Sequence, residues 1–128
     1  MKLLLDTHTF IWLDTAPDKL SPAAFAACED PNNQLYLSVI SAWEIQIKVQ
    51  LGRLKLDLPW EHMVEVQQVE NGLQILPVTL AHISALTGLP QLHGDPFDRL
   101  LIAQAHIEQA QLVSSDSRIK HYPVDVIW

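Results

Sequence analysis

Short apolar runs alternate along this chain with longer segments whose apolar residues recur at helical spacing. The runs at residues 2–5, 34–38, 73–76, 112–114 and 124–127 predict β-strands. Helices are predicted at about 8–14, 21–29, 39–51 or 42–51, 59–71, 79–87 and 95–109. Strands that alternate with helices are typical of a parallel sheet covered by helices on both faces. The pattern therefore predicts an α/β fold.

The first and fourth predicted strands are the most informative ones. The run from Lys2 to Leu5 has no polar alternation after its first residue, which indicates a strand buried on both faces. It ends at Asp6, and the fourth run ends two residues before Asp116. Ligands of open α/β sheets bind beyond the carboxyl ends of the strands. These two acids are therefore candidate site residues, although the pattern leaves open whether their strands are neighbours.

Two helices and the last strand have more specific patterns. Within the third helix Trp43, Ile47 and Leu51 recur every four residues and form one apolar stripe. The helix that begins after Pro59 is expected to place Met63, Val66 and Val69 on its inner side. The Val-Asp-Val alternation near the carboxyl terminus predicts a strand at the edge of the sheet.

Composition narrows the class of protein. At 128 residues the chain is expected to form one domain, residues 1–128. The single cysteine, Cys28, cannot form an internal disulfide, which is typical of a reducing compartment. Three leucines before Asp6 are too few for a signal-peptide core, so we expect a cytoplasmic protein. Residues 71–94 lack Asp, Glu, Lys and Arg, but their prolines and glycines argue against a membrane span.

The net charge of −7 does not favour nucleic-acid binding by general electrostatics. An acidic chain can still act on RNA if metal ions neutralise its carboxylates and a local basic strip contacts phosphates. Six basic residues are candidates for such a strip: Lys48, Arg53, Lys55, Arg99, Arg118 and Lys120.

Each candidate acid also has a structural interpretation. Asp6 stands where a helix N-cap is expected, so capping and function are equally supported. Glu44 follows Ser41 by three residues, which matches a capping box, and precedes Lys48 by four, which matches a surface ion pair. Spacing alone favours these structural interpretations of Glu44.

The segment from Asp95 to Asp98 is ambiguous in the same way. Asp95 before Pro96 matches an N-cap followed by a first-turn proline. Asp98 falls at the third helical position, where a carboxylate gains from the helix dipole. Asp116 lies between serines and is also a good turn former.

Separate structural interpretations do not explain two acids at strand ends together with two more near helix starts. Carboxylates that converge repel one another unless cations neutralise them. Mg²⁺ or Mn²⁺ would suit oxygen ligands of this kind. A metal ion held by such acids can activate water for in-line attack on a phosphodiester. The hypothesis is phosphodiester hydrolysis.

Four motifs follow one another along the chain: Leu3–His8, Ser38–Ile45, Asp95–Ala105 and Val113–Asp116. Together they resemble PIN domains, and most closely the VapC-type toxins of bacterial toxin–antitoxin pairs. The resemblance implies a three-layer fold with a central parallel sheet in the order 3-2-1-4-5, which would place the first and fourth strands side by side.

The resemblance also implies roles for individual residues. Asp6, Glu44 and Asp98 match the three core acids and Asp116 the more variable fourth, so all four are expected to be catalytic and metal-binding. Asp6 and Asp98 are the preferred direct ligands. Thr7, Asp95, Arg99 and Ser115 are candidates for contacts to the metal ligands or to phosphate, and Asp95 acts either as a ligand or only as a helix cap. His8 and His93 are interpreted as structural.

The function implied is that of a Mg²⁺- or Mn²⁺-dependent endoribonuclease toxin that forms a homodimer and is inhibited by a cognate antitoxin. A basic antitoxin segment would complement the charge of −7. The main alternative is a catalytically silent PIN-like module that only binds a partner or RNA. An aspartate phosphatase of the haloacid-dehalogenase kind is a third reading, but His8 stands where that chemistry needs a second Asp.

Overall fold

The computed structural model describes residues 1–92 and 94–128. Its strands are β1 (Lys2–Leu5), β2 (Gln34–Ser38), β3 (Gln74–Leu76), β4 (Gln111–Val113) and β5 (Val126–Ile127). Its α-helices are α1 (Thr7–Thr15), α2 (Pro22–Glu29), α3 (Val39–Gln50), α4 (Trp60–Asn71), α5 (Leu80–Ala85) and α6 (Pro96–Glu108). Three 3₁₀ turns are also present: η1 (Pro17–Lys19), η2 (Leu86–Gly88) and η3 (Ile119–His121).

The strands form one five-stranded sheet in the order β3-β2-β1-β4-β5, and each pair is parallel. This confirms the expected order. Leu5 pairs with Leu37 of β2 on one side and with Val113 of β4 on the other. The carboxyl ends of β1 and β4 therefore lie side by side, and β5 is an edge strand as predicted.

Strand β1 is the centre of the core. Leu3, Leu4 and Leu5 are each 0% exposed, which confirms a strand buried on both faces. Leu3 and Leu5 join a cluster with residues of α1, α2, α3 and α4, such as Phe10. Leu4 joins a second cluster with residues of α6, such as Ile102. Because successive side chains of a strand point to opposite faces, the two clusters are the two interfaces of a three-layer fold.

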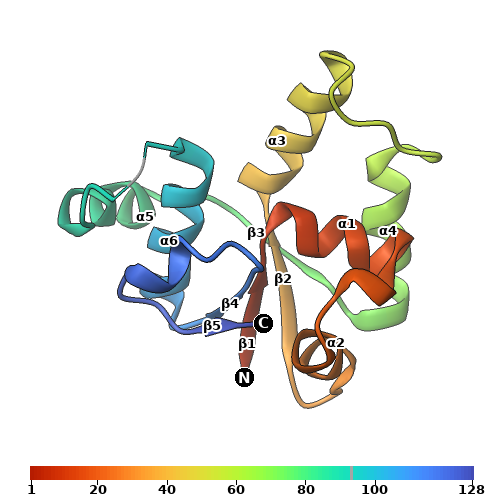
Figure 1. Cartoon of the computed structure of the whole chain (residues 1–128), viewed down its shortest axis with the longest axis horizontal. Helices are drawn as coiled ribbons and strands as arrows, with labels where there is room; N and C mark the ends of the chain where they lie inside the picture. Colours follow the sequence, from red (N-terminus) through yellow and green to blue (C-terminus); the bar gives the residue numbers. More distant parts are fainter. Residues whose placement is uncertain (93) are drawn as a thin grey trace.

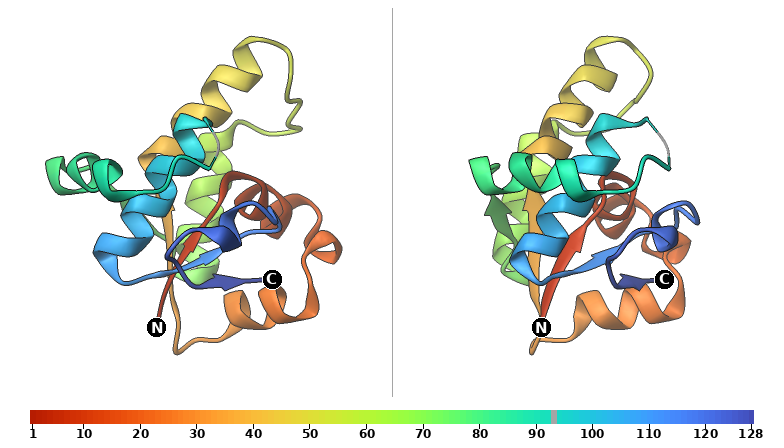
Figure 2. Two further views of the ribbon diagram at one scale, coloured as in Figure 1. Left: turned by 60° about the vertical axis from the view of Figure 1, so that its left-hand side comes forward. Right: turned by 90° about the vertical axis from the view of Figure 1, so that its left-hand side faces the viewer.

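The arrangement of the layers is visible in the ribbon views. Helices α1, α2 and α4 cover one face of the sheet, and α6 with α5 outside it covers the other (Figure 1). Figure 2 shows α6 running alongside the sheet with α5 packed against it. Helix α3 continues upward from β2 beyond the ends of the strands, so its first turns stand beside the amino end of α6 (Figure 1).

The capping residues in the sequence predicted most helix ends correctly. Ser21 caps α2, Thr79 caps α5 and Asp95 caps α6, each through a side-chain oxygen that accepts backbone N–H groups. Gly72 ends α4 at φ +65°, a left-handed conformation that glycine adopts without a Cβ penalty. These elements begin and end within a few residues of their predicted bounds.

Some sequence predictions were wrong in detail. The N-cap of α3 is Ser38, whose Oγ accepts the Ile40 N–H at 3.1 Å, so Ser41 lies inside the helix and forms no capping box with Glu44. Val69 of α4 is 87% exposed, whereas Gln67 is buried and bonds Asp14 of α1 through its side-chain amide.

The last strand is shorter than predicted. The Val124 N–H donates to the Tyr122 carbonyl at 2.8 Å, which makes a tight turn just before the ladder starts. Strand pairing therefore begins only at Val126.

None of the helices in the described part of the chain is both long and apolar enough to cross a membrane.

Candidate functional site

Asp6 lies at the carboxyl end of β1 and is also the N-cap of α1. Its Oδ1 accepts the Thr9 N–H at 2.8 Å, and the side chain is only 7% exposed. Its own N–H donates to the Val113 carbonyl at 3.1 Å, and the Thr9 hydroxyl donates to the same carbonyl at 3.0 Å. The capping interpretation of Asp6 is therefore confirmed, and the cap holds the carboxylate where β1 and β4 end together.

Glu44 is brought to this edge by Thr7, the residue after Asp6. The Thr7 hydroxyl donates to Glu44 Oε1 at 2.6 Å, and Lys48 Nζ lies 2.8 Å from Glu44 Oε2. The predicted ion pair with Lys48 is present. Glu44 lies in the second turn of α3 rather than in its first turn, so the helix dipole is not what places it. Its position depends on a contact across 37 residues of sequence.

Asp98 and Asp116 share one cation, the guanidinium of Arg118. Arg118 Nη2 lies 2.7 Å from Asp116 Oδ2 and 3.6 Å from Asp98 Oδ2. Arg118 Nε also donates to both oxygens of Asp116, at 3.1 and 3.2 Å. Hydrogen bonding to Asp116 and the charge of Asp116 raise the pKa of Arg118, with smaller additions from Asp98 and Asp95. The two acids are therefore neighbours of a single positive charge.

Local hydrogen bonds explain how these two acids are positioned. Asp98 is the third residue of α6. Asp95 Oδ1 accepts the N–H groups of Phe97 and Asp98 at 2.9 and 3.2 Å, so Asp95 has the cap role that its sequence suggested. The N–H of Asp116 donates to the hydroxyl of Ser114, a buried residue just after β4.

The remaining candidates make contacts of their own or are exposed. Arg99 donates to the Pro90 carbonyl at 2.7 Å and to the Tyr122 hydroxyl at 3.4 Å, so it joins loop segments on either side of α6. Ser115 is exposed in the loop after β4. His8 is exposed and its ring lies 5.7 Å from that of Trp12, which fits a structural role. The prediction for His93 lies outside the described residues.

A groove of about 420 Å³ runs beside the acids, between α3 and the start of α6. Glu44, Lys48, Arg53, Asp95 and Phe97 are among its lining residues. The ring of Phe97 meets that of Trp43 edge-on at 5.5 Å, and Trp43 is 58% exposed. The groove thus combines cationic and aromatic side chains next to a carboxylate.

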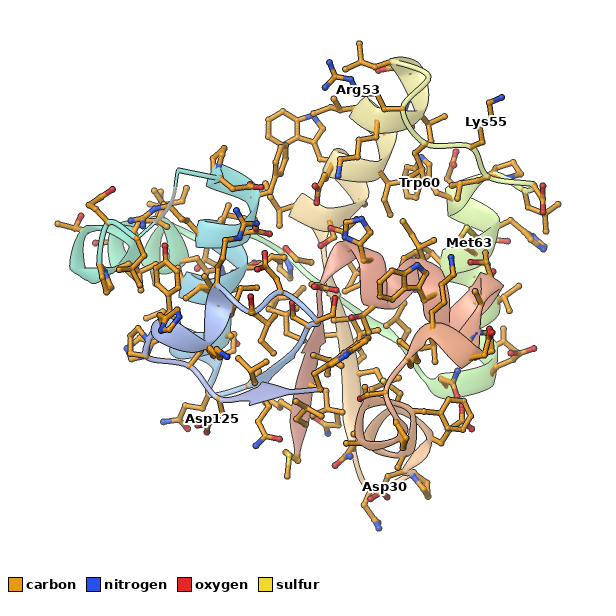
Figure 3. All side chains as sticks on the ribbon, viewed as in Figure 1. Asp30, Arg53, Lys55, Trp60, Met63 and Asp125 are labelled. Carbon is orange, nitrogen blue, oxygen red and sulfur yellow. The ribbon has the colours of Figure 1, made fainter. Side chains whose placement is uncertain are left out.

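The predicted basic strip is only partly formed along this groove. Arg53 lies at the far end of α3, whereas Lys55 extends from the following segment on the side of α4 (Figure 3). Lys48 and Arg53 line the groove, and Lys48 is already paired with Glu44.

The four candidate acids, Asp6, Glu44, Asp98 and Asp116, offer carboxylate oxygens, which are the ligand type that a hard divalent cation prefers. Asp98 and Asp116 suit it in placement as well, because both reach one cationic group. Within residues 1–92 and 94–128, however, no three acidic, histidine or cysteine side chains are gathered into a ready metal-binding set. In the arrangement described, Lys48 pairs with Glu44 and Arg118 with Asp98 and Asp116, which offsets part of the charge of the four acids.

Sequence reasoning missed the central position of Arg118, which it treated only as one of several basic residues. The available signal was the Asp-x-Arg spacing of Asp116 and Arg118 directly after a buried strand. It also missed Ser114, whose hydroxyl orients Asp116.

Comparison with known proteins identifies the family of this chain. The family model for the PIN domain matches residues 3–125. Over 124 residues the chain is 30% identical to Ribonuclease VapC22 of Mycobacterium tuberculosis, an alignment that covers 94% of this chain and 91% of that protein.

Solved structures share the fold. The crystal structure of VapBC2 from Rickettsia felis bound to a promoter DNA fragment contains a chain with a TM-score of 0.73, 19% identity and coverage of 98% of this chain and 97% of that one. A DNA-bound VapBC from Salmonella typhimurium gives 0.65 at 15% identity, with coverage of 98% and 96%. The family match over nearly the whole sequence, the VapC relative and the shared architecture agree, and the chain therefore belongs to the PIN domain family as a member of its VapC type.

Proposed function

We propose that this chain is a divalent-metal-dependent endoribonuclease that acts as the toxin of a toxin–antitoxin pair. The proposal rests above all on the convergence of acids at the carboxyl edge of the sheet. Asp6 ends β1, Asp116 follows the neighbouring strand β4, and Arg118 joins Asp116 to Asp98 of α6. The name of the VapC22 relative, a ribonuclease, supports RNA as the substrate class.

In this proposal the chain's own residues position and polarise the reaction. Asp6, Asp98, Glu44 and Asp116 are the metal ligands and catalytic carboxylates, with Asp6 and Asp98 as preferred direct ligands. Thr7 fixes the carboxylate plane of Glu44 through its hydroxyl. When bound, Mg²⁺ or Mn²⁺ supplies Lewis-acid polarisation of the phosphate and lowers the charge repulsion among the acids.

The groove between α3 and α6 suits a single RNA strand. Arg53 offers a cation for the phosphate backbone, and the exposed ring of Trp43 offers a face on which a base can stack. These short-range contacts would hold RNA in the groove, although the net charge of −7 disfavours its long-range attraction.

The partners belong to the same proposal. The VapBC structures are complexes of two components, which supports an antitoxin as the natural inhibitor. Val39 of α3 and Leu51 just after it are 40% and 60% exposed, and these exposed apolar side chains support a homodimer. We further propose that residues 1–128 act as one domain in the cytoplasm.

The test is RNA cleavage by the purified chain with Mg²⁺ or Mn²⁺, compared with Asp6→Asn. Asn caps helices as well as Asp does, so this variant keeps the Thr9 contact and loses only the charge. We expect a fall in the cleavage rate of at least about a hundredfold. Asp18→Asn in η1 is the matched control, since Asp18 is exposed on another part of the surface, and full activity is expected there.

Two outcomes would contradict the proposal. Full activity of Asp6→Asn would remove Asp6 from the machinery and with it the mechanism. An unmodified chain that binds Mn²⁺ and RNA but cuts no RNA would favour the alternative, a catalytically silent PIN-like binding module. Chelation by EDTA should abolish cleavage, and added Mg²⁺ or Mn²⁺ should restore it.

A further inference from the structure

Arg118 occupies an unusual place for a surface arginine. Its guanidinium contacts two carboxylates that come from different parts of the fold, Asp98 at the start of α6 and Asp116 in the loop after β4. Its backbone N–H also donates to Asp116 Oδ1 at 2.9 Å, which anchors the turn that aims the side chain. The guanidinium is therefore directed at the acidic site by the loop itself.

The guanidinium of Arg118 can leave the two carboxylates because it is exposed to solvent. The Arg118 side chain is 58% exposed, whereas those of Asp98 and Asp116 are only 20% and 24% exposed. The two carboxylates belong to the site, but the arginine lies over them from the solvent side. Exposed ion pairs are weak and reversible, so this side chain can leave at little cost.

The same contact also reduces the repulsion between the two acids. Two carboxylates within reach of one guanidinium repel each other, and their charge must be balanced. Arg118 provides one positive charge and several N–H donors in a planar fork. A divalent ion provides two charges and demands the same oxygen atoms, so the guanidinium and the ion compete for them.

We propose that Arg118 is an internal counter-ion that occupies the cation position between Asp98 and Asp116 and is displaced when metal binds there. This inference rests on the proposed metal-dependent function. Arg118 thus lowers the metal affinity of the site and keeps the acids together before metal arrives. It is a positioning residue for the acids.

The experiment is calorimetric titration of MnCl₂ into the full chain and its variants at physiological ionic strength. Arg118→Gln should bind Mn²⁺ about five- to tenfold more tightly than the unmodified chain, because the competing cation is gone. Arg118→Lys keeps the charge but loses the fork and should fall between the two. Lys120→Gln removes an equal charge from the exposed surface of η3, which begins just after Arg118, and should change Mn²⁺ affinity less than about twofold, because salt screens it.

Thermal unfolding supplies a readout that a merely structural arginine would not change. Without metal, Arg118→Gln should melt below the unmodified chain, because Asp98 and Asp116 then repel each other. With saturating Mn²⁺ the difference should vanish or reverse, since tighter binding to the folded state adds stability. A purely structural ion pair would give the same difference in both conditions.

The outcomes separate this inference from the proposed function. Equal Mn²⁺ affinity of Arg118→Gln and the unmodified chain, with a metal-independent melting difference, would overturn the role of Arg118 and leave the nuclease proposal intact. Tighter Mn²⁺ binding by Arg118→Gln without RNA cleavage by any form would support the counter-ion and overturn the nuclease. If neither form bound Mn²⁺, both proposals would fall.

Discussion

The hydroxyl of Thr7 donates to Glu44 Oε1 at 2.6 Å and so joins the first turn of α1 to the second turn of α3. Thr7 is 5% exposed, and Lys48 holds the other oxygen of the same carboxylate. Both oxygens of Glu44 therefore have a defined partner, and the plane of the carboxylate is set by residues on two helices.

Thr7→Val should remove the hydrogen bond between α1 and Glu44 while leaving the helix in place. Loss of a charge-assisted hydrogen bond should cost about 1.5–3 kcal/mol of unfolding free energy at most, and misorientation of Glu44 should lower kcat/KM about 10- to 100-fold. Chemical denaturation and RNA cleavage assays measure these effects. Thr7→Ser retains the hydroxyl and should keep most of the activity.

The matched control is Thr15→Val on the same helix. Thr15 is exposed and its hydroxyl bonds only along the helix, to the Ile11 carbonyl at 2.7 Å. This variant should cleave RNA as the unmodified chain does. Equal losses of activity in the Thr7 and Thr15 variants would mean that helix stability, rather than the orientation of Glu44, is responsible.

Asp95 should act as a cap and not as a metal ligand. Its Oδ1 accepts two backbone N–H groups at the start of α6, a role that serine can also perform. Asp95→Ser should therefore keep both stability and Mn²⁺ affinity, whereas Asp95→Ala should lose about 1 kcal/mol of unfolding free energy. A tenfold loss of Mn²⁺ affinity in Asp95→Ser, measured by calorimetry, would instead place Asp95 among the ligands.

Arg53 should contribute to RNA binding without affecting the chemical step. Arg53→Gln should raise KM with kcat unchanged and should reduce the salt dependence of binding by about 0.7 in log–log slope, the effect of one lost phosphate contact on a single strand. Lys55→Gln is the control, because Lys55 lies on the side of α4 (Figure 3). If both variants changed the slope equally, general charge rather than the groove would explain the effect.

Cys28 should react slowly with alkylating agents. Burial raises the pKa of its thiol from 9.0 to about 11, with the charge of Glu29 adding to the shift. At pH 8 the thiolate should be about a hundredfold scarcer than in a thiol of pKa 9.0, and labelling by iodoacetamide should be correspondingly slow. Labelling in denaturant is the control and should be fast. Equally rapid labelling of the folded chain would contradict the burial.

The same shift has a defined sign for stability. A thiol whose folded-state pKa is raised stabilises the fold fully below its unfolded pKa of 9.0 and loses this contribution as pH rises through about 11. Unfolding free energies measured between pH 8 and pH 11 should therefore fall, and Cys28→Ala should reduce that part of the fall.

The sequence by itself determined most of the elements and the central place of β1. An uninterrupted leucine run can be satisfied only by burial on both faces, and capping residues such as Ser21 and Asp95 act on the nearest backbone N–H groups. These are local interactions, so they can be predicted from the sequence without knowledge of the fold. The strand-end positions of Asp6 and Asp116 could be predicted for the same reason.

Only the tertiary structure decided which groups meet. Ser41 and Glu44 have the spacing of a capping box. However, α3 begins directly after β2 with Ser38 as its N-cap, and Glu44 accepts a hydrogen bond from Thr7 of another helix instead. Likewise, no periodicity in the chain pairs Arg118 with Asp98, because that contact depends on the parallel order that places β4 beside β1. Contacts between distant segments follow from packing of the whole chain, so a local sequence pattern cannot predict them.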